Sequence, residues 1–163
     1  MILGQPADSY PLPVFSDISS QTHLADVGND PIQVLKDTAN IQVLALFAAN
    51  ESLRKLSFLN ENWDGFGSAR PDPIAIRNAQ GWIQTLYQSA LSTGLSWKQP
   101  NITASEEGDV VFEWWKGTHK LTLYVGPQRL DYVQVWGPDI LREMADGELV
   151  GDRFQDLWRW LYA

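Results

Sequence analysis

The amino-acid sequence predicts an α+β fold in which two long helices pack on a four-stranded antiparallel meander, followed by two short C-terminal helices. Two observations predict it. Apolar residues recur at three- and four-residue spacing through residues 31–95, and the period changes to about two over residues 100–137. Helices and strands that are segregated along the chain are typical of α+β folds. We expect one domain over residues 1–163, with an acidic N-terminal arm at 1–30 and the C-terminal helices at 138–163.

The first helix begins at Asp30-Pro31, because Asp is a favourable N-cap and proline fits the first helical position, where no backbone N–H is needed. Its apolar face alternates three- and four-residue steps, with Gln42 as the one polar member. The residues of this face are Ile32, Leu35, Ala39, Leu46, Ala49, Leu53 and Leu56. Asn40 and Asn50 are weak helix formers, so the segment is either one helix or two that end near Asn60.

The second helix begins at Asp72-Pro73, which repeats the N-cap and proline pair, and ends at Gly94. One side of it carries Ile76, Ala79, Ile83, Leu86, Tyr87, Ala90 and Leu91. This amphipathic pattern predicts a helix that covers a sheet.

Four strands follow, separated by short turns that include Glu107-Gly108 and Lys116-Gly117. We predict the strands at Ile102–Ala104, Asp109–Trp115, Lys120–Val125 and Leu130–Trp136. Short turns make neighbouring strands antiparallel, so the strands form a meander. After Gly137-Pro138 the pattern predicts one helix over 138–145 and a last helix over 152–162.

The composition restricts the possible functions. The chain has 163 residues, with 12 Lys+Arg against 20 Asp+Glu, a net charge of -8 and no cysteine. Scattered basic residues on an acidic chain argue against nucleic-acid binding. Without cysteine there are no disulfides, thiolate metal sites or cysteine nucleophiles. No apolar run approaches the length of about 18 residues that a membrane helix needs.

The first 35 residues contain neither Lys nor Arg. A secretory signal needs a basic region ahead of its apolar stretch, so we expect a cytoplasmic protein. Two interpretations of this acidic arm stay open: a solvated terminal segment, or a ligand for a basic partner.

The richest local motif is the run N-W-D-G-F-G-S-A-R-P, which starts at Asn62 and joins the two predicted helices. Gly65 and Gly67 allow positive φ twice, and an aspartate at position 64 favours a local turn. In one interpretation Trp63 and Phe66 fill the core beside the helix ends while Asp64 caps the turn. In the other, Trp63, Asp64 and Phe66 form a recognition surface.

The run resembles the N-W-D-G-Y-G-A-x-P motif of a group of small, largely uncharacterised bacterial proteins, in which a hairpin of the form G-x-[VI]-x-[FL]-E-W follows. Here the hairpin element is Gly108 to Trp114, so the resemblance covers about residues 50–136. The chain departs from the motif in Phe66, in an inserted Ser68 and in its N-terminal arm. The resemblance implies a bacterial, cytoplasmic protein of the kind carried by mobile elements or defence islands.

The sequence offers few catalytic groups. Its two histidines, His23 and His119, stand apart, and no metal-binding spacing, nucleophile elbow or phosphate loop occurs. We therefore expect no catalytic residues, no metal and no cofactor. The enzyme alternative is a hydrolase-like site in which Asp64 and Glu113 act as acid and base in an aromatic-lined pocket.

Eight tryptophans favour an interaction surface. Trp114 and Trp115 are consecutive on a strand, so one of them faces away from the core. Trp158 and Trp160 are two apart on a helix and cannot share a narrow stripe. The candidate binding residues are Trp63, Asp64, Phe66, Glu113, Trp115, Trp136 and Trp160.

The sequence therefore predicts a non-catalytic intracellular protein-interaction module, of the antitoxin, immunity or inhibitor type, that acts on a basic partner. The expected partner is another protein or a second copy of the chain, with no nucleic acid and no membrane. Besides the enzyme, the other alternative is a structural or assembly component that forms a homo-oligomer.

Overall fold

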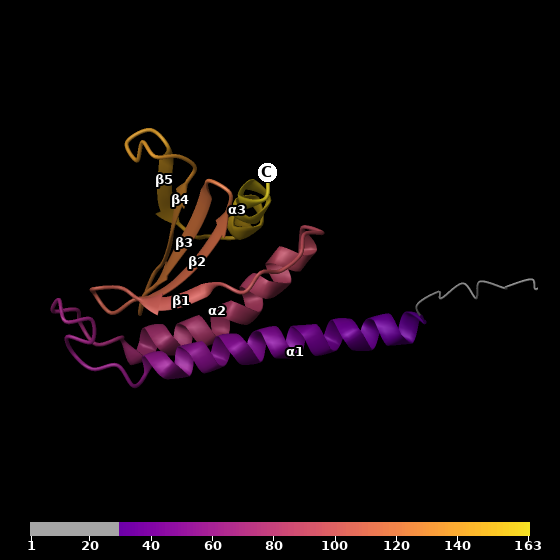
Figure 1. Cartoon of the computed structure of the whole chain (residues 1–163), viewed down its shortest axis with the longest axis horizontal. Helices are drawn as coiled ribbons and strands as arrows, with labels where there is room; N and C mark the ends of the chain where they lie inside the picture. Colours follow the sequence, from indigo (N-terminus) through magenta and orange to yellow (C-terminus); the bar gives the residue numbers. More distant parts are fainter. Residues whose placement is uncertain (1–29) are drawn as a thin grey trace, which may run out of the picture.

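The computed structural model describes residues 30–163, so the predicted arm lies outside the described residues except for its last residue. The described chain is α+β, with three helices and a five-stranded antiparallel sheet (Figure 1). The elements are α1 (Pro31–Leu56), α2 (Pro73–Ser92), β1 (Asn101–Ala104), β2 (Val110–Lys116), β3 (His119–Val125), β4 (Leu130–Val135), β5 (Met144–Glu148) and α3 (Arg153–Leu161).

Both predicted N-caps are confirmed. The backbone N–H of Ile32 donates to the Asp30 carboxylate at 3.1 Å, and the N–H of Ile74 donates to the Asp72 carboxylate at 2.6 Å. Each cap satisfies an N–H that the helix itself leaves free, which stabilises the helix by about 1 kcal/mol. Residues 31–56 form one helix, which settles the alternative of two, and it ends before Asn60.

The strands lie in their sequence order, β1-β2-β3-β4-β5, and every neighbouring pair is antiparallel. The meander is as predicted, but it has five strands. The prediction of a helix over 138–145 is wrong: the chain turns there and returns as β5, in which Val133 pairs with Asp146.

The turn between β4 and β5 explains this difference. The Glu143 carboxylate accepts from the Asp139 N–H at 2.8 Å, and the Trp136 N–H donates to the Glu143 carbonyl at 3.0 Å, which together close the hairpin. Ile140 and Leu141, two large apolar residues of this segment, are 60% and 96% exposed. So short a helix with no apolar face to bury is unstable, whereas pairing with β4 satisfies the backbone.

The core lies between the sheet and the helices. One face of β2 and β3 is fully buried and consists of Val110, Phe112, Trp114, Leu121, Leu123 and Val125. Helix α2 contacts both strands, and α3 contacts α2 and β3. Each of these large side chains contributes roughly 1.5–3 kcal/mol through burial. The alternation predicted that one of the two consecutive tryptophans faces away from the core: Trp114 is buried, and Trp115, at 49% exposure, points to the opposite face.

Helix α1 lies along α2 and β1 at the edge of this core, and its N-terminal half extends beyond them (Figure 1). The predicted apolar face of α1 is buried only at its C-terminal end, at Ala49, Leu53 and Leu56. Ile32 and Leu35 on the same face are 60% and 70% exposed. The expectation that the whole face covers the sheet is therefore wrong, because α1 is longer than the surface available to it.

Candidate functional site

The structure distributes the seven candidate residues over three places. Trp63, Asp64 and Phe66 lie in the loop between α1 and α2. Glu113 and Trp115 lie on the face of β2 that points away from the helices, and Trp136 and Trp160 lie beside each other, with ring centroids 6.3 Å apart. Sequence reasoning therefore identified three separate surface features and no single pocket.

The loop after α1 is a hydrogen-bonded turn centred on Asp64. The Asp64 carboxylate accepts from the Phe66 N–H at 2.9 Å and from the Ser68 hydroxyl at 2.5 Å. Asn62, itself at φ 59°, accepts from the Gly67 N–H through its side chain at 2.7 Å. The positive φ angles expected of the two glycines are present, at 80° for Gly65 and 92° for Gly67. Capping of the turn by Asp64 is thus confirmed.

The aromatic residues of the loop do not fill the core. Phe66 is 92% exposed and Trp63 is 37% exposed, while Ser68 and Pro71 are the buried residues of the segment. The loop thus combines the two interpretations of the motif: Asp64 forms the turn, and the turn exposes Phe66 and part of Trp63.

The same loop docks on the turn between β1 and β2. The Ala69 N–H donates to the Glu106 carbonyl at 2.8 Å, and the Asp72 N–H donates to the Gly108 carbonyl at 2.9 Å. Gly108, at φ 90°, approaches so closely that an added Cβ would lie 2.7 Å from the Arg70 carbonyl oxygen. The two sequence motifs, at 62–71 and 108–114, are therefore two halves of one structural contact.

The Asp64 turn makes stability depend on pH. The Ser68 hydroxyl first, and then the Phe66 N–H, hold the pKa of Asp64 below its ordinary value of 3.8. A lowered folded-state pKa contributes stability above the unfolded-state pKa, and this contribution is lost as the pH falls through the folded-state pKa. We expect Asp64→Asn to flatten the acid limb of the stability curve between about pH 5 and pH 2, measured as urea midpoints. The exposed acid Asp156 supplies the control, Asp156→Asn; equal slopes for both variants and the parent chain would contradict the assignment.

The face of the sheet that points away from the helices, here called the open face, carries the Glu113 and Trp115 pair. Lys120 of β3 connects them: its ammonium is 2.5 Å from a Glu113 carboxylate oxygen and 5.2 Å from the centre of the Trp115 ring. Thr122 is buried next to Glu113 in the register of the two strands. Half of Trp115 remains accessible, which makes it the largest aromatic contact available on this face.

Sequence reasoning missed the remaining acids of the open face. In the strand register Glu113, Thr122, Val133 and Asp146 form one row across four strands. The neighbouring row across the same four strands consists of Val111, which is buried, and of Tyr124, Asp131 and Glu148. On β4, Asp131 alternates with the buried Leu130 and Tyr132, so its place on this face could be predicted from the sequence. Asp146 and Glu148 lie on the face only because their segment forms strand β5.

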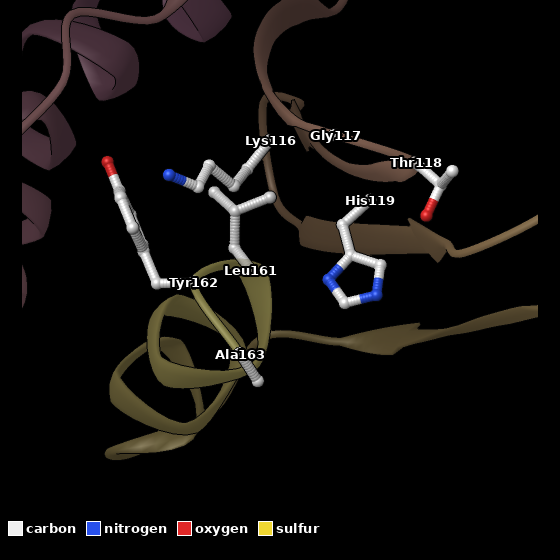
Figure 2. A pocket seen from close by; sticks show the side chains of 7 residues that line it. All are labelled: Lys116, Gly117, Thr118, His119, Leu161, Tyr162 and Ala163. Atoms are coloured by element: carbon white, nitrogen blue, oxygen red, sulfur yellow. The ribbon is translucent and has the colours of Figure 1, made fainter.

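Trp136 and Trp160 belong to an aromatic cluster at the other side of the sheet, beside α3. The His119 ring stacks on Trp160 at 4.6 Å, and a His119 ring nitrogen lies 3.1 Å from the Trp160 carbonyl oxygen. An open cavity of about 280 Å³ adjoins it, and Figure 2 shows Lys116, His119 and Tyr162 around Leu161 at its wall. Burial raises the pKa of Tyr162 above its ordinary value of 10.0. His119 is therefore a packing residue of this cluster.

The geometry does not support the acid–base pair of the enzyme alternative. Asp64 is bound by Ser68 and by turn amides, and its lowered pKa makes it a poor proton donor. Glu113 is paired with Lys120 on another element. Within residues 30–163, no group of three or more His, Asp or Glu side chains is placed to hold a metal ion, and none of the described helices is long and apolar enough to cross a membrane.

Comparisons of this chain with protein-family models, with curated proteins and with solved structures find no match. The resemblance of its two motifs to small bacterial proteins stays a prediction. The assignment of function therefore rests on the geometry of the described residues.

Proposed function

We propose that this chain is a non-catalytic protein-binding module that binds a basic partner protein through the open face of its sheet. The observation that carries this proposal is that the core residues of the helices pack with one face of the sheet, and that the other face gathers four carboxylates around the half-exposed Trp115 and the partly buried Tyr124. The four are Glu113, Asp131, Asp146 and Glu148.

The charge on the open face favours a basic partner. Two basic side chains lie next to these four carboxylates. Lys120 pairs with Glu113, and Arg129 at the rim of the face lies 3.5 Å from Asp131. Carboxylates arranged on a rigid sheet steer positively charged surfaces and suppress binding of acidic ones. The net charge of -8 adds to this attraction at a distance.

The aromatic residues of the open face supply the contact area that charge alone does not. Trp115 is 49% exposed, and Tyr124 lies two residues from Thr122 on the same face. Tryptophan and tyrosine are enriched among the residues that dominate binding energy, and arginine side chains stack well on their rings. A basic protein surface rich in arginine is the partner chemistry that this face fits best.

The biological role that we propose for this binding is that of an antitoxin, an immunity protein or an inhibitor. Such proteins act by covering a basic functional surface, and they need no catalytic group of their own. The acidic composition and the motif resemblance support this role, as does the acidic sequence that precedes α1. We place its action inside the cell.

A selection experiment tests the proposal. The full-length chain is immobilised, peptides are selected on it from a displayed random library, and we expect the bound peptides to be rich in Arg and Lys. Their binding is expected to fall by about tenfold for Asp146→Asn/Glu148→Gln.

The matched control is Asp139→Asn/Asp156→Asn, which removes the same charge outside the open face. It is expected to bind like the parent chain. Selected peptides without positive charge, or equal losses in both double variants, would contradict the proposal.

A further inference from the structure

The N-terminal segment of α1, residues 31–48, exposes more apolar surface than any other described helix. Seven large side chains in it are between 45% and 70% exposed: Ile32, Val34, Leu35, Ile41, Val43, Leu44 and Phe47. Side chains of these types at such exposure present on the order of 100 Å² each, or about 700 Å² together. A typical monomer has no patch larger than about 300–600 Å².

These side chains lie on several sides of the helix. Successive residues are rotated by about 100°, so Ile41, Val43 and Leu44 point in three different directions. A helix that is apolar all round belongs in the interior of an assembly of helices. Within the described residues α1 contacts α2 and β1, and its buried residues all lie in its C-terminal part, so the N-terminal part needs a partner.

The spacing of the apolar residues indicates that the partner is itself a helix. Positions 32, 35, 39, 42, 46, 49, 53 and 56 alternate steps of three and four, which is the repeat of a helix-to-helix seam. The C-terminal end of this seam is buried, at Ala49, Leu53 and Leu56, where α1 packs on α2. The same repeat continues to the N-terminal end of α1, which extends beyond α2 (Figure 1).

We infer that two copies of this chain associate by pairing residues 31–48 of α1 with the same segment of the second copy. A second copy supplies an identical helix with an identical seam, as a self-complementary two-fold interface requires. A partner helix packs on one side of the segment, so the pair covers part of the roughly 700 Å², and the seam contributes Ile32 and Leu35 to it. The segment has one positive and one negative residue, Lys36 and Asp37, so the pairing brings no net charge together despite the charge of the whole chain.

This interface is separate from the open face. It lies on α1, whereas the acids and Trp115 that we propose for partner binding lie on strands β2 to β5. A two-fold pair therefore presents two open faces, and two sites linked in one assembly bind a partner with paired sites more tightly than either site alone. Loss of one interface leaves the other measurable.

Light scattering on the full-length chain tests the inference first. We expect twice the mass of one chain at micromolar concentration, and the mass of one chain for Leu35→Glu/Val43→Glu with an unchanged near-ultraviolet circular dichroism spectrum. Ile140→Glu/Leu141→Glu, which places the same charges on exposed apolar residues of the loop between β4 and β5, is the control and is expected to remain dimeric.

A monomeric parent chain would overturn the inference. In that case, a lower melting temperature of Leu35→Glu/Val43→Glu would indicate that residues 1–29 of the same chain bind this segment of α1. An unchanged melting temperature would indicate that a different protein binds it. A dimer that persists in Leu35→Glu/Val43→Glu would overturn it as well, because it would place the interface elsewhere.

Cysteine cross-linking supplies a second readout that does not depend on disrupting the helix. The chain has no cysteine, so a single introduced cysteine forms disulfides only between two copies. Ala39 is exposed near the middle of the segment, where it lies close to its counterpart in either relative direction of the helices. We expect Ala39→Cys to cross-link under mild oxidation and Leu141→Cys to do so much less. Equal cross-linking of the two variants would overturn the inference.

Discussion

Replacing Gly108 by alanine is expected to lower the free energy of unfolding by about 3 kcal/mol. The backbone of Gly108 has φ 90°, a conformation that costs other residues roughly 1–2 kcal/mol. The added Cβ would also lie 2.7 Å from the Arg70 carbonyl oxygen. Relief of this collision moves the loop away from the hairpin and breaks its hydrogen bonds, each of which contributes about 1 kcal/mol. Urea unfolding followed by tryptophan fluorescence measures the change.

Gly65 provides the matched control within the other motif. It has φ 80°, but an added Cβ would meet no atom within 4 Å. Gly65→Ala therefore tests positive φ without a collision, and we expect a loss of about 1 kcal/mol. If the two variants lose equal stability, the contact between the motifs contributes nothing beyond the turn conformations.

Replacing Trp158 by alanine is expected to lower the free energy of unfolding by about 4 kcal/mol. Trp158 is 0% exposed and lies at the centre of an aromatic cluster, 5.5 Å from the ring of Trp97, 5.7 Å from Trp114 and 5.5 Å from Phe154. Its removal leaves a cavity that the rigid sheet and α2 cannot close.

Two further variants separate the packing of Trp158 from its polar group. The Trp158 indole N–H is buried with no hydrogen-bond partner among the described residues, so Trp158→Phe removes an unsatisfied donor and is expected to lose clearly less stability than Trp158→Ala. Trp115→Ala, on the open face, is expected to change stability by under about 1 kcal/mol. A loss for Trp115→Ala as large as that for Trp158→Ala would contradict the assignment of the two faces.

Local signals made most of the fold predictable. The Asp-Pro pairs located the starts of α1 and α2 to the residue, because an N-cap followed by proline has one favoured position in a helix. Strict alternation along β2 separated Trp114 from Trp115 correctly. These features depend on residues that are near each other in the chain.

The features that failed depend on distant parts of the chain. Residues 138–145 have apolar spacing that suits a helix, but β4 offers an unpaired edge that the isolated sequence does not reveal. Helix α1 has a continuous apolar face, but the sheet and α2 are long enough to cover only its C-terminal end. The period of a pattern predicts which residues share a face, and it does not say what lies opposite that face.

The sequence identified individual candidate residues, but it did not predict which of them lie together in the structure. Trp63, Asp64 and Phe66 were recognised from glycine and aspartate turn chemistry, and Glu113 and Trp115 from alternation. Their separation into a loop and a sheet face follows from the register and the docking of the loop, neither of which has a local signal. The acids of β5 were missed because that strand was taken for a helix.

The two motifs also have a clearer interpretation in the structure. Their residues at 62–71 and 108–114 meet through backbone hydrogen bonds at one end of the sheet, and this contact joins the two motifs of this chain into one structural unit. The turn geometry fixes the orientation of β2, and β2 in turn places Glu113 and Trp115 on the open face. The motifs thus support the proposed binding surface without forming it.

Binding of a basic partner by the open face is tested most directly by the dissociation constant of the strongest selected peptide, measured at increasing salt for the parent chain and the two double variants. For Asp146→Asn/Glu148→Gln we predict binding at least about tenfold weaker than for the parent chain, with Asp139→Asn/Asp156→Asn unchanged. We further predict that this difference shrinks toward about 0.5 M salt, where the Debye length is about 4 Å. Equal constants for the two double variants, or binding by the parent chain that does not weaken with salt, would contradict the claim.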